Sequence, residues 1–151
     1  MESMAGAALP VLEDRIRSCG FYHVKARYIK ESMQGLIGRF HGEVPSSLEE
    51  LMTLPGVGRK IGNLMLGDLF GIQAIVVDTH CARISKCIGL TDSTDPTRIE
   101  QDLMKCVPEN EWTNYGHRMV AHGRALCIAR NPKCPRCPLQ RICKKGMETI
   151  E

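Results

Sequence analysis

The chain has 151 residues, which is enough for one compact unit or two small lobes and too few for several independent domains. Hydrophobic residues make up 43% and charged residues 25%, ordinary globular values that argue against disorder and against a low-complexity scaffold. No apolar run is long enough to cross a bilayer and no secretory signal opens the chain, so we expect a cytoplasmic protein with no membrane partner. In that reducing compartment, the eight cysteines are better explained by a metal or redox centre than by disulfides.

The net charge of +3 is unevenly distributed along the chain. Residues 1–111 hold 12 Lys and Arg against 15 Asp and Glu, whereas residues 112–151 hold 8 against 2. Most charge runs are solvated tails, but this basic stretch also contains four of the cysteines and is therefore expected to fold. A folded basic surface commonly faces a polyanion.

The helical period of hydrophobic residues recurs through most of the chain, which predicts an all-α fold. A basic amphipathic helix is predicted over 22–40, followed by shorter helices over 48–53 and 59–69. The two short helices are joined by the tight, glycine-containing turn 54–58 and so form a helix-hairpin-helix. A longer helix is predicted over 111–126.

Capping residues mark the ends of the remaining helices. Ser46 or Ser47 is expected to cap the first helix of the hairpin. Asp78 stands at the N-cap position of a further helix, which Gly89 ends. Asp95, followed by proline, opens the next helix.

Four thiols lie within 17 residues, in the pattern Cys127-x6-Cys134-x2-Cys137-x5-Cys143, interleaved with prolines. Four thiolates could hold zinc tetrahedrally or a [4Fe-4S] cubane. Zinc sites more often contain two Cys-x2-Cys pairs, and the single pair here favours iron and sulfur. The other four cysteines are expected to be core residues: Cys19, Cys81, Cys87 and Cys106.

Three motifs, taken in order, resemble the endonuclease III family of helix-hairpin-helix DNA glycosylases. They are Leu54-Pro55-Gly56-Val57-Gly58-Arg59-Lys60, then Val77-Asp78-Thr79-His80, then the cysteine pattern. The resemblance runs from about Ile16 to Lys145, nearly the whole chain. It implies a [4Fe-4S] cluster with the ligands Cys127, Cys134, Cys137 and Cys143.

The resemblance also implies that Lys60 is a catalytic nucleophile and Asp78 a catalytic carboxylate. A lysine amine that attacks the sugar C1′ displaces a damaged base and leaves a Schiff base, which permits strand cleavage by β-elimination. Asp78 is expected to stabilise the developing sugar cation and to help move protons. Taken alone, such a lysine is usually a solvated helix residue and such an aspartate only an N-cap.

DNA contacts are expected at two places. Gly56, Val57 and Gly58 let the hairpin backbone approach a phosphate, independently of base sequence. Arg130 and Lys133 lie in the cysteine loop, where a cluster would hold them for phosphate contact. The alternatives are a purely structural glycine turn and a solvated loop.

We therefore expect a helix-hairpin-helix lobe over 1–76 and an iron-sulfur lobe over 77–151, with a DNA cleft between them. The implied function is base-excision repair by a monomer, at the nucleoid if the source is prokaryotic. It removes oxidised bases, pyrimidines above all, from double-stranded DNA and then cleaves the strand as an AP lyase.

Two other functions stay open. A monofunctional relative resembling the adenine-mismatch glycosylases is disfavoured by Lys60, because those proteins lack a lysine at this position. A truncated, non-catalytic DNA-binding module is suggested by the N-terminus. Family members carry further helices ahead of the segment matching Ile16 to Arg27, including a Ser-Ala-Gln-type stretch, and this sequence has no counterpart to them. The hairpin lobe is therefore expected to be incomplete.

Overall fold

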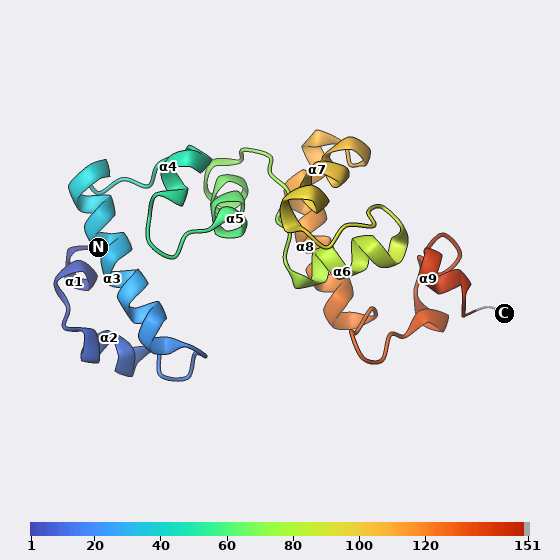
Figure 1. The fold of residues 1–151 in the computed structure, drawn as a ribbon, viewed down its shortest axis with the longest axis horizontal. Coiled ribbons are helices and arrows are strands. Elements are labelled where there is room, and N and C mark those ends of the chain that lie inside the picture. Colours follow the sequence, from blue (N-terminus) through green and yellow to red (C-terminus); the bar gives the residue numbers. More distant parts are fainter. Residues whose placement is uncertain (150–151) are drawn as a thin grey trace. The chain divides into compact units, whose positions relative to one another are not determined.

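The computed structural model describes residues 1–149, and all the regular elements among them are helical, which confirms the predicted all-α fold (Figure 1). The elements are α1 (Glu2–Gly6), α2 (Leu9–Arg15), α3 (Tyr22–Phe40), α4 (Leu48–Met52), α5 (Arg59–Phe70), α6 (Thr79–Ile88), α7 (Pro96–Cys106), η1 (Glu109–Glu111), α8 (Trp112–Ala125), η2 (Cys134–Arg136) and α9 (Lys144–Met147).

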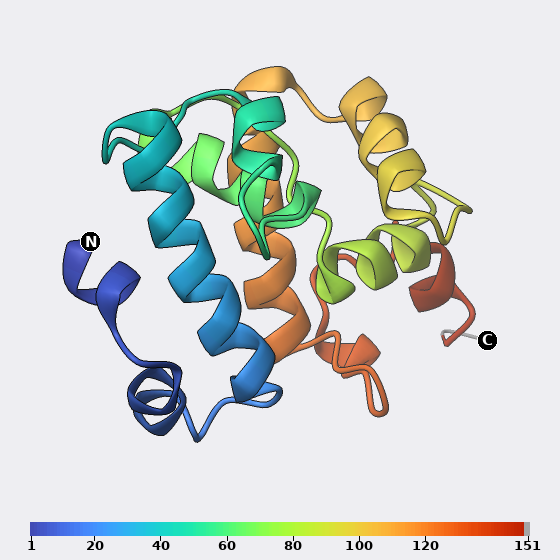
Figure 2. The same cartoon turned by 60° about the vertical axis from the view of Figure 1, so that its left-hand side comes forward.

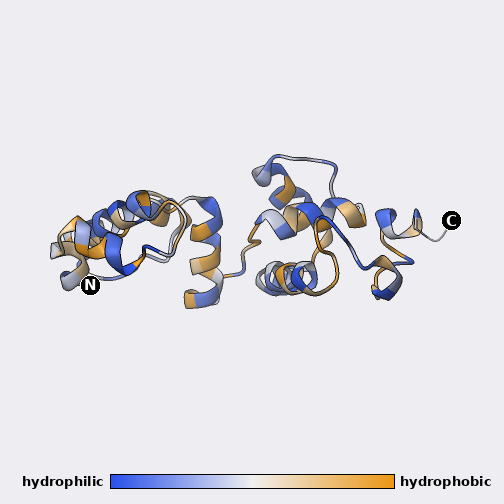
Figure 3. Cartoon of the chain, turned by 90° about the horizontal axis from the view of Figure 1, so that it is seen from below, coloured by the Kyte–Doolittle hydropathy of each residue, from blue (hydrophilic) through white to orange (hydrophobic). Residues whose placement is uncertain are grey.

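The helices carry both hydrophilic and hydrophobic residues along their length (Figure 3). Accordingly, no helix within residues 1–149 combines the length and the apolar character that a membrane span requires.

The chain divides into two compact units, Met1–Gly62 and Asn63–Glu151. This division falls inside α5, ahead of the boundary at residues 76 and 77 that we predict between the two functional lobes. The lobes are defined by their motifs rather than by compactness, and their boundary stays a prediction.

In the first unit, α1 and α2 pack against the long helix α3 (Figure 2). Lys30 Nζ donates to the Ala7 carbonyl at 2.8 Å, and Gln34 Nε2 donates to the Ala5 carbonyl at 3.1 Å. Both side chains belong to α3, and they satisfy carbonyls at the C-terminal end of α1, where a helix lacks internal partners. These two N-terminal helices were not predicted from the sequence.

The rest of the first unit holds α4, the hairpin turn and the first residues of α5, with α3 packed against the turn. Leu36, Leu51 and Leu54 are buried between these elements. Arg39 Nη2 donates to the Thr53 carbonyl at 3.1 Å, which ties the end of α3 to the end of α4. Apolar burial of this kind stabilises the fold by about 1.5–3 kcal/mol for each leucine.

The second unit has a single apolar core, to which α6, α7 and α8 contribute. Its buried side chains are Ile75, Cys81, Ile84, Ile99, Leu103 and Met119. Trp112 packs on this core and donates from Nε1 to the Val107 carbonyl at 2.9 Å.

The predicted caps are confirmed. Ser47, Asp78 and Asp95 each accept a backbone N–H at the start of their helices, and Gly89 ends α6 with φ of 99°. Between Ser46 and Ser47, the structure therefore selects Ser47.

The assignment of the non-motif cysteines to the core is confirmed only for Cys81, which is fully buried. Cys19 and Cys106 are exposed, so that prediction is wrong for both. Cys106 lies in the last turn of α7, where its thiol donates to carbonyls of its own helix instead of packing inward.

Candidate metal centre and nucleic-acid interface

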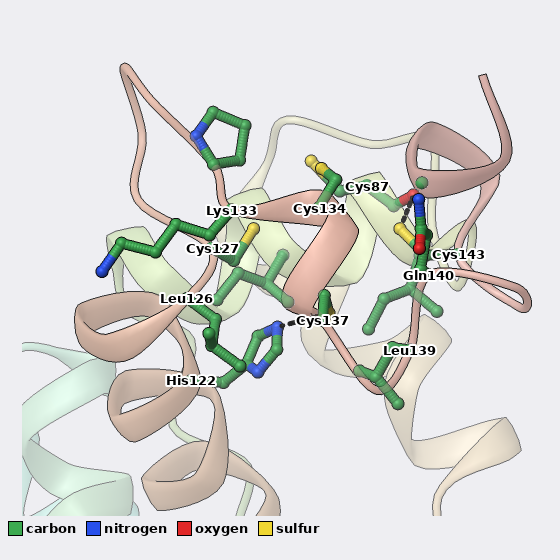
Figure 4. Close-up of a pocket in the computed structure, with 14 residues that line it drawn as sticks. Cys87, His122, Leu126, Cys127, Lys133, Cys134, Cys137, Leu139, Gln140 and Cys143 are labelled. Atoms are coloured by element: carbon green, nitrogen blue, oxygen red, sulfur yellow. Dashed lines mark hydrogen bonds between the residues drawn. The ribbon is translucent and has the colours of Figure 1, made fainter. Parts of the chain in front are cut away.

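The four motif cysteines line one cavity in the second unit (Figure 4). Cys127 follows α8, Cys134 opens η2, Cys137 follows η2, and Cys143 is the N-cap of α9. The rest of the wall is largely apolar and includes Ile84, Ile88, Leu126 and Leu139. The prolines of the loop and the short helical turns thus bring together four thiols that are spread over 17 residues of sequence.

Polar groups reach three of these sulfurs. Arg83 Nη1 donates to Cys127 Sγ at 3.2 Å. His122 Nε2 lies 3.6 Å from Cys137 Sγ, and the Cys143 thiol donates to the Cys87 carbonyl at 3.2 Å (Figure 4). A guanidinium and an imidazole beside sulfur stabilise the negative charge that a ligating thiolate carries.

The donor set at this cavity fits an iron-sulfur cluster, because four thiols line it together. A zinc site needs its sulfurs about 2.3 Å from a common centre, whereas a cubane is a larger body held at its corners. Four thiols that surround a mainly apolar cavity therefore match the second type of group.

The turn of the hairpin lies in the first unit and is anchored to α3. Val57 N donates to the Leu54 carbonyl at 3.0 Å, which closes the turn. Ser32 Oγ donates to the Pro55 carbonyl at 2.5 Å. Gly56 has φ of 78°, and a side chain there would lie 2.8–2.9 Å from Tyr28. The glycine is therefore required both by the backbone and by the close packing of Tyr28.

Lys60 is exposed on the first turn of α5, directly after this turn. The first hydrogen bond of the helix runs from Gly62 N to the Gly58 carbonyl at 2.9 Å. The N–H groups in the first turn of a helix point out of its N-terminal end, and Lys60 stands in this turn of α5.

Asp78 belongs to the second unit, at the end of the extended connector before α6. Its Oδ1 accepts a 2.7 Å bond from Cys81 N, which fixes the half-buried carboxylate at the helix start.

Arg130 and Lys133 are both exposed in the loop between α8 and η2. Lys133 Nζ donates to the Ala125 carbonyl at 3.3 Å, and its backbone N–H donates to the Leu126 carbonyl at 2.9 Å. Lys133 is therefore tied to the end of α8, while its side chain remains accessible.

Sequence reasoning missed Arg83 and Cys87 as neighbours of the cysteine loop. Both lie on α6, and Cys87 is half-buried in the wall of the same cavity as the four motif cysteines. Burial raises the pKa of the Cys87 thiol, and the nearby Cys127 and Cys143 add to the rise. No spacing rule could have identified these residues, because they lie more than 35 residues before the loop.

Comparisons with known proteins match both halves of the chain. Residues 1–109 match the profile of the HhH-GPD superfamily base excision DNA repair proteins. Residues 127–143, bounded by the first and last motif cysteines, match the iron-sulfur binding domain of endonuclease III.

Individual relatives agree with these profiles. Endonuclease III of Synechocystis sp. is 47% identical over 133 residues, which are 87% of this chain and 61% of that protein. Endonuclease III of Bacillus subtilis is 38% identical over 97% of this chain and 68% of its own length. The chain thus spans roughly two thirds of the length of these relatives.

Solved structures extend the likeness to the whole chain. A trapped endonuclease III-DNA covalent intermediate matches with a TM-score of 0.93 and 42% identity, over 99% of this chain and 71% of that one. A non-covalent endonuclease III-DNA complex matches equally well, at 43% identity. The likeness therefore includes α1 and α2, which lie ahead of the Ile16 at which the sequence resemblance begins. A thermostable thymine-DNA glycosylase shares the fold at 20% identity, with a TM-score of 0.87.

Proposed function

We infer the function from one premise: the chain belongs to the endonuclease III family, within the HhH-GPD superfamily of base excision DNA repair proteins. Its cofactor is a [4Fe-4S] cluster. From that premise, we propose that the chain is a DNA glycosylase that removes oxidised bases, pyrimidines above all, from double-stranded DNA, and that it then cleaves the strand as an AP lyase. It would act as a monomer in the cytoplasm, at the nucleoid.

The proposed cluster ligands are Cys127, Cys134, Cys137 and Cys143. This assignment is supported by the single cavity that they line and by the family profile, which covers the same span. The bound cluster would hold the loop between α8 and α9 in one conformation. Arg130 and Lys133 would then be presented to phosphates from a fixed scaffold.

The proposed nucleophile is Lys60, acting through its neutral amine. Its nitrogen bonds to the sugar C1′ while the bond from C1′ to the base breaks, and the base leaves with a proton. The C1′–O4′ bond of the sugar then breaks as O4′ takes up a proton, which gives the Schiff base. The Schiff base acidifies the C2′ proton, and removal of that proton expels the 3′ phosphate. The exposed position on the first turn of α5, directly after the hairpin turn, supports this role because it leaves the amine accessible to a bound duplex.

Asp78 is the proposed carboxylate that stabilises positive charge on the sugar as the base departs. Its support is the fixed orientation given by the cap bond to Cys81 N. Preorganised charge of this kind costs no rearrangement when the reaction occurs.

The proposed duplex contacts use the hairpin as a backbone donor. Since Val57 N–H is already engaged in the turn, Val57 would act by shaping it, and the backbone of Gly58 at the N-terminal end of α5 would face the phosphate. Such contacts position the DNA without reading its sequence.

The observation that carries the proposal is Lys60 on α5 directly after the hairpin turn, in a chain with the endonuclease III cysteine loop. The same lysine argues against a monofunctional mismatch glycosylase. A non-catalytic DNA-binding module remains the competing function.

Borohydride trapping on a duplex with one abasic site separates the two functions, because only a Schiff base is captured covalently. The wild-type chain should be trapped and should nick the duplex. Lys60→Gln should abolish both results while duplex affinity stays within a few fold, since one charge among many is lost. Lys86→Gln removes an equal charge from α6 and serves as the control, for which normal trapping is expected.

A wild-type chain that binds duplex and carries its cluster but traps nothing would establish the binding module instead. Equal trapping by wild type and Lys60→Gln would show that the nucleophile is another residue.

A further inference from the structure

Cys87 is a fifth thiol at the cluster site. It lies in the last turn of α6, outside the cysteine loop, and its half-buried side chain lines the same cavity as the four motif cysteines (Figure 4). None of the motifs that define the site includes this residue.

Cys87 shares more of its surroundings with three of the motif cysteines than with the fourth. A second, adjoining cavity is lined by Cys87 together with Cys127, Cys134 and Cys143, but not by Cys137. Cys137 lies beside His122 of α8 instead, with its sulfur 3.6 Å from that imidazole. Cys87 therefore shares both cavities with three of the motif cysteines and only one with Cys137.

Among those three, Cys143 has a direct contact with residue 87. Its thiol donates to the Cys87 carbonyl at 3.2 Å, across 56 residues of sequence. The helices that carry the two cysteines, α6 and α9, pack against each other. The Cys143 sulfur therefore lies against the backbone of residue 87, and the side chains of both residues line the same two cavities.

We propose that Cys87 is a reserve ligand that can take the coordination position of Cys143, an inference that rests on the proposed ligand set. In this exchange, the bond from iron to the Cys143 sulfur breaks and that sulfur takes up a proton, while the Cys87 thiol releases its proton to solvent and its sulfur bonds to the same iron. Three ligands stay in place, and no electrons are transferred. Because α6 is formed by its own cap and core contacts, the reserve ligand is held ready by an element independent of the loop.

The test compares iron content and visible absorbance of purified variants of the 151-residue chain. Cys143→Ala should retain about four irons per chain and a visible absorption whose shape is altered by the new ligand. Cys87→Ala/Cys143→Ala should lose both. Cys137→Ala is the matched control: it should lose the cluster although Cys87 is present, because Cys87 does not share the second cavity with Cys137.

Equal iron loss in Cys143→Ala and in the double variant would overturn the proposal while leaving the ligand set intact. Full iron content in Cys137→Ala, or none in the wild type, would instead overturn the ligand set itself.

A second measurement applies if Cys143→Ala does not fold. Wild type, Cys87→Ala and Cys106→Ala are exposed to an iron chelator, and the loss of absorbance is followed with time. Iron loss should be several-fold faster in Cys87→Ala, because a transiently released position can no longer be refilled, and unchanged in Cys106→Ala, whose thiol is exposed on α7. Identical rates in the three proteins would reject a reserve ligand.

Discussion

At Asp78, one carboxylate serves both the fold and the proposed chemistry. Its Oδ1 accepts a bond from Cys81 N, and this bond requires an oxygen acceptor but not a negative charge. Stabilising a sugar cation requires the charge. The two roles can therefore be separated by choosing the substituting residue.

Asp78→Asn should slow base release by about tenfold or more in single-turnover assays, because the charge is lost. Its thermal unfolding should stay close to that of wild type, because asparagine is an equally good N-cap. Asp78→Ala should also lower the free energy of unfolding by about 1 kcal/mol. Undiminished activity in Asp78→Asn would exclude the catalytic role.

Ser85 joins the buried thiol of Cys81 and the half-buried phenol of Tyr115 in the second unit. The Tyr115 hydroxyl lies 2.7 Å from Ser85 Oγ, and Cys81 Sγ lies 3.9 Å from the same oxygen. Burial raises the pKa of Tyr115 from its ordinary value of 10.0 to about 12. Burial likewise raises the pKa of Cys81 from 9.0 to about 11.

These shifts predict alkaline destabilisation. Both groups hold their protons more tightly in the folded chain, so their stabilising contribution is complete below pH 9.0 and is lost as the pH rises toward about 12. Denaturant unfolding at increasing pH should show this loss for wild type and a weaker loss for Tyr115→Phe. Tyr28→Phe, which alters an exposed tyrosine of α3, should behave as wild type does. The same slope in all three proteins would contradict the assignment.

At the scale of the element, the two glycines of the hairpin turn, Gly56 and Gly58, have different roles. Gly56 has a left-handed backbone and is covered by Tyr28, whereas no atom lies within 4 Å of the position that a Gly58 side chain would occupy. The first glycine is therefore required by the fold. The second leaves space where the proposed phosphate contact is made.

Gly56→Ala should destabilise the protein by about 1–3 kcal/mol, through backbone strain and displacement of Tyr28. Gly58→Ala should leave unfolding nearly unchanged but weaken duplex binding, since a methyl group would keep the phosphate from the backbone. Thermal unfolding and duplex titration of both variants separate the effects. Unchanged affinity in Gly58→Ala would remove the turn from the DNA interface.

At the scale of the whole molecule, basic charge is concentrated in the C-terminal quarter of the chain. Residues 112–151 hold 8 Lys and Arg against 2 Asp and Glu, and Arg130 and Lys133 are exposed in the loop of the proposed cluster. Phosphate contacts of this kind release counterions, so binding is expected to weaken steeply with salt and to depend little on sequence.

Lys133→Ala should reduce the slope of log affinity against log salt by about one unit on a duplex of any sequence. Lys105→Ala is the control, because that lysine is paired with Asp102 on α7. Fluorescence anisotropy at several salt concentrations measures the slope. Equal salt slopes for Lys133→Ala and wild type would show that Lys133 lies on ordinary solvated surface and makes no phosphate contact.

The sequence by itself determined the all-α fold and the bounds of α3, α4, α5 and α8 to within one residue at each end, but not α1 and α2. It also determined the capping residues of α4, α6 and α7. It also determined the four thiols that meet at one cavity. These features depend on interactions among residues a few positions apart: a cap bonds within one turn, and a glycine turn or a short cysteine spacing limits where the chain can go. Features that depend on interactions between neighbouring residues can therefore be predicted from the sequence.

Only the tertiary structure decided what surrounds those thiols. The contacts of Arg83 with Cys127 and of Cys87 with Cys143 span 44 and 56 residues and exist because α6 packs beside the cysteine loop. The same packing put Cys81 in the core and Cys87 in the cavity wall, six residues apart on one helix, while Cys106 of α7 was left exposed. Helical period predicts which residues share a face, but the neighbour that covers a face is chosen by the packing of distant segments.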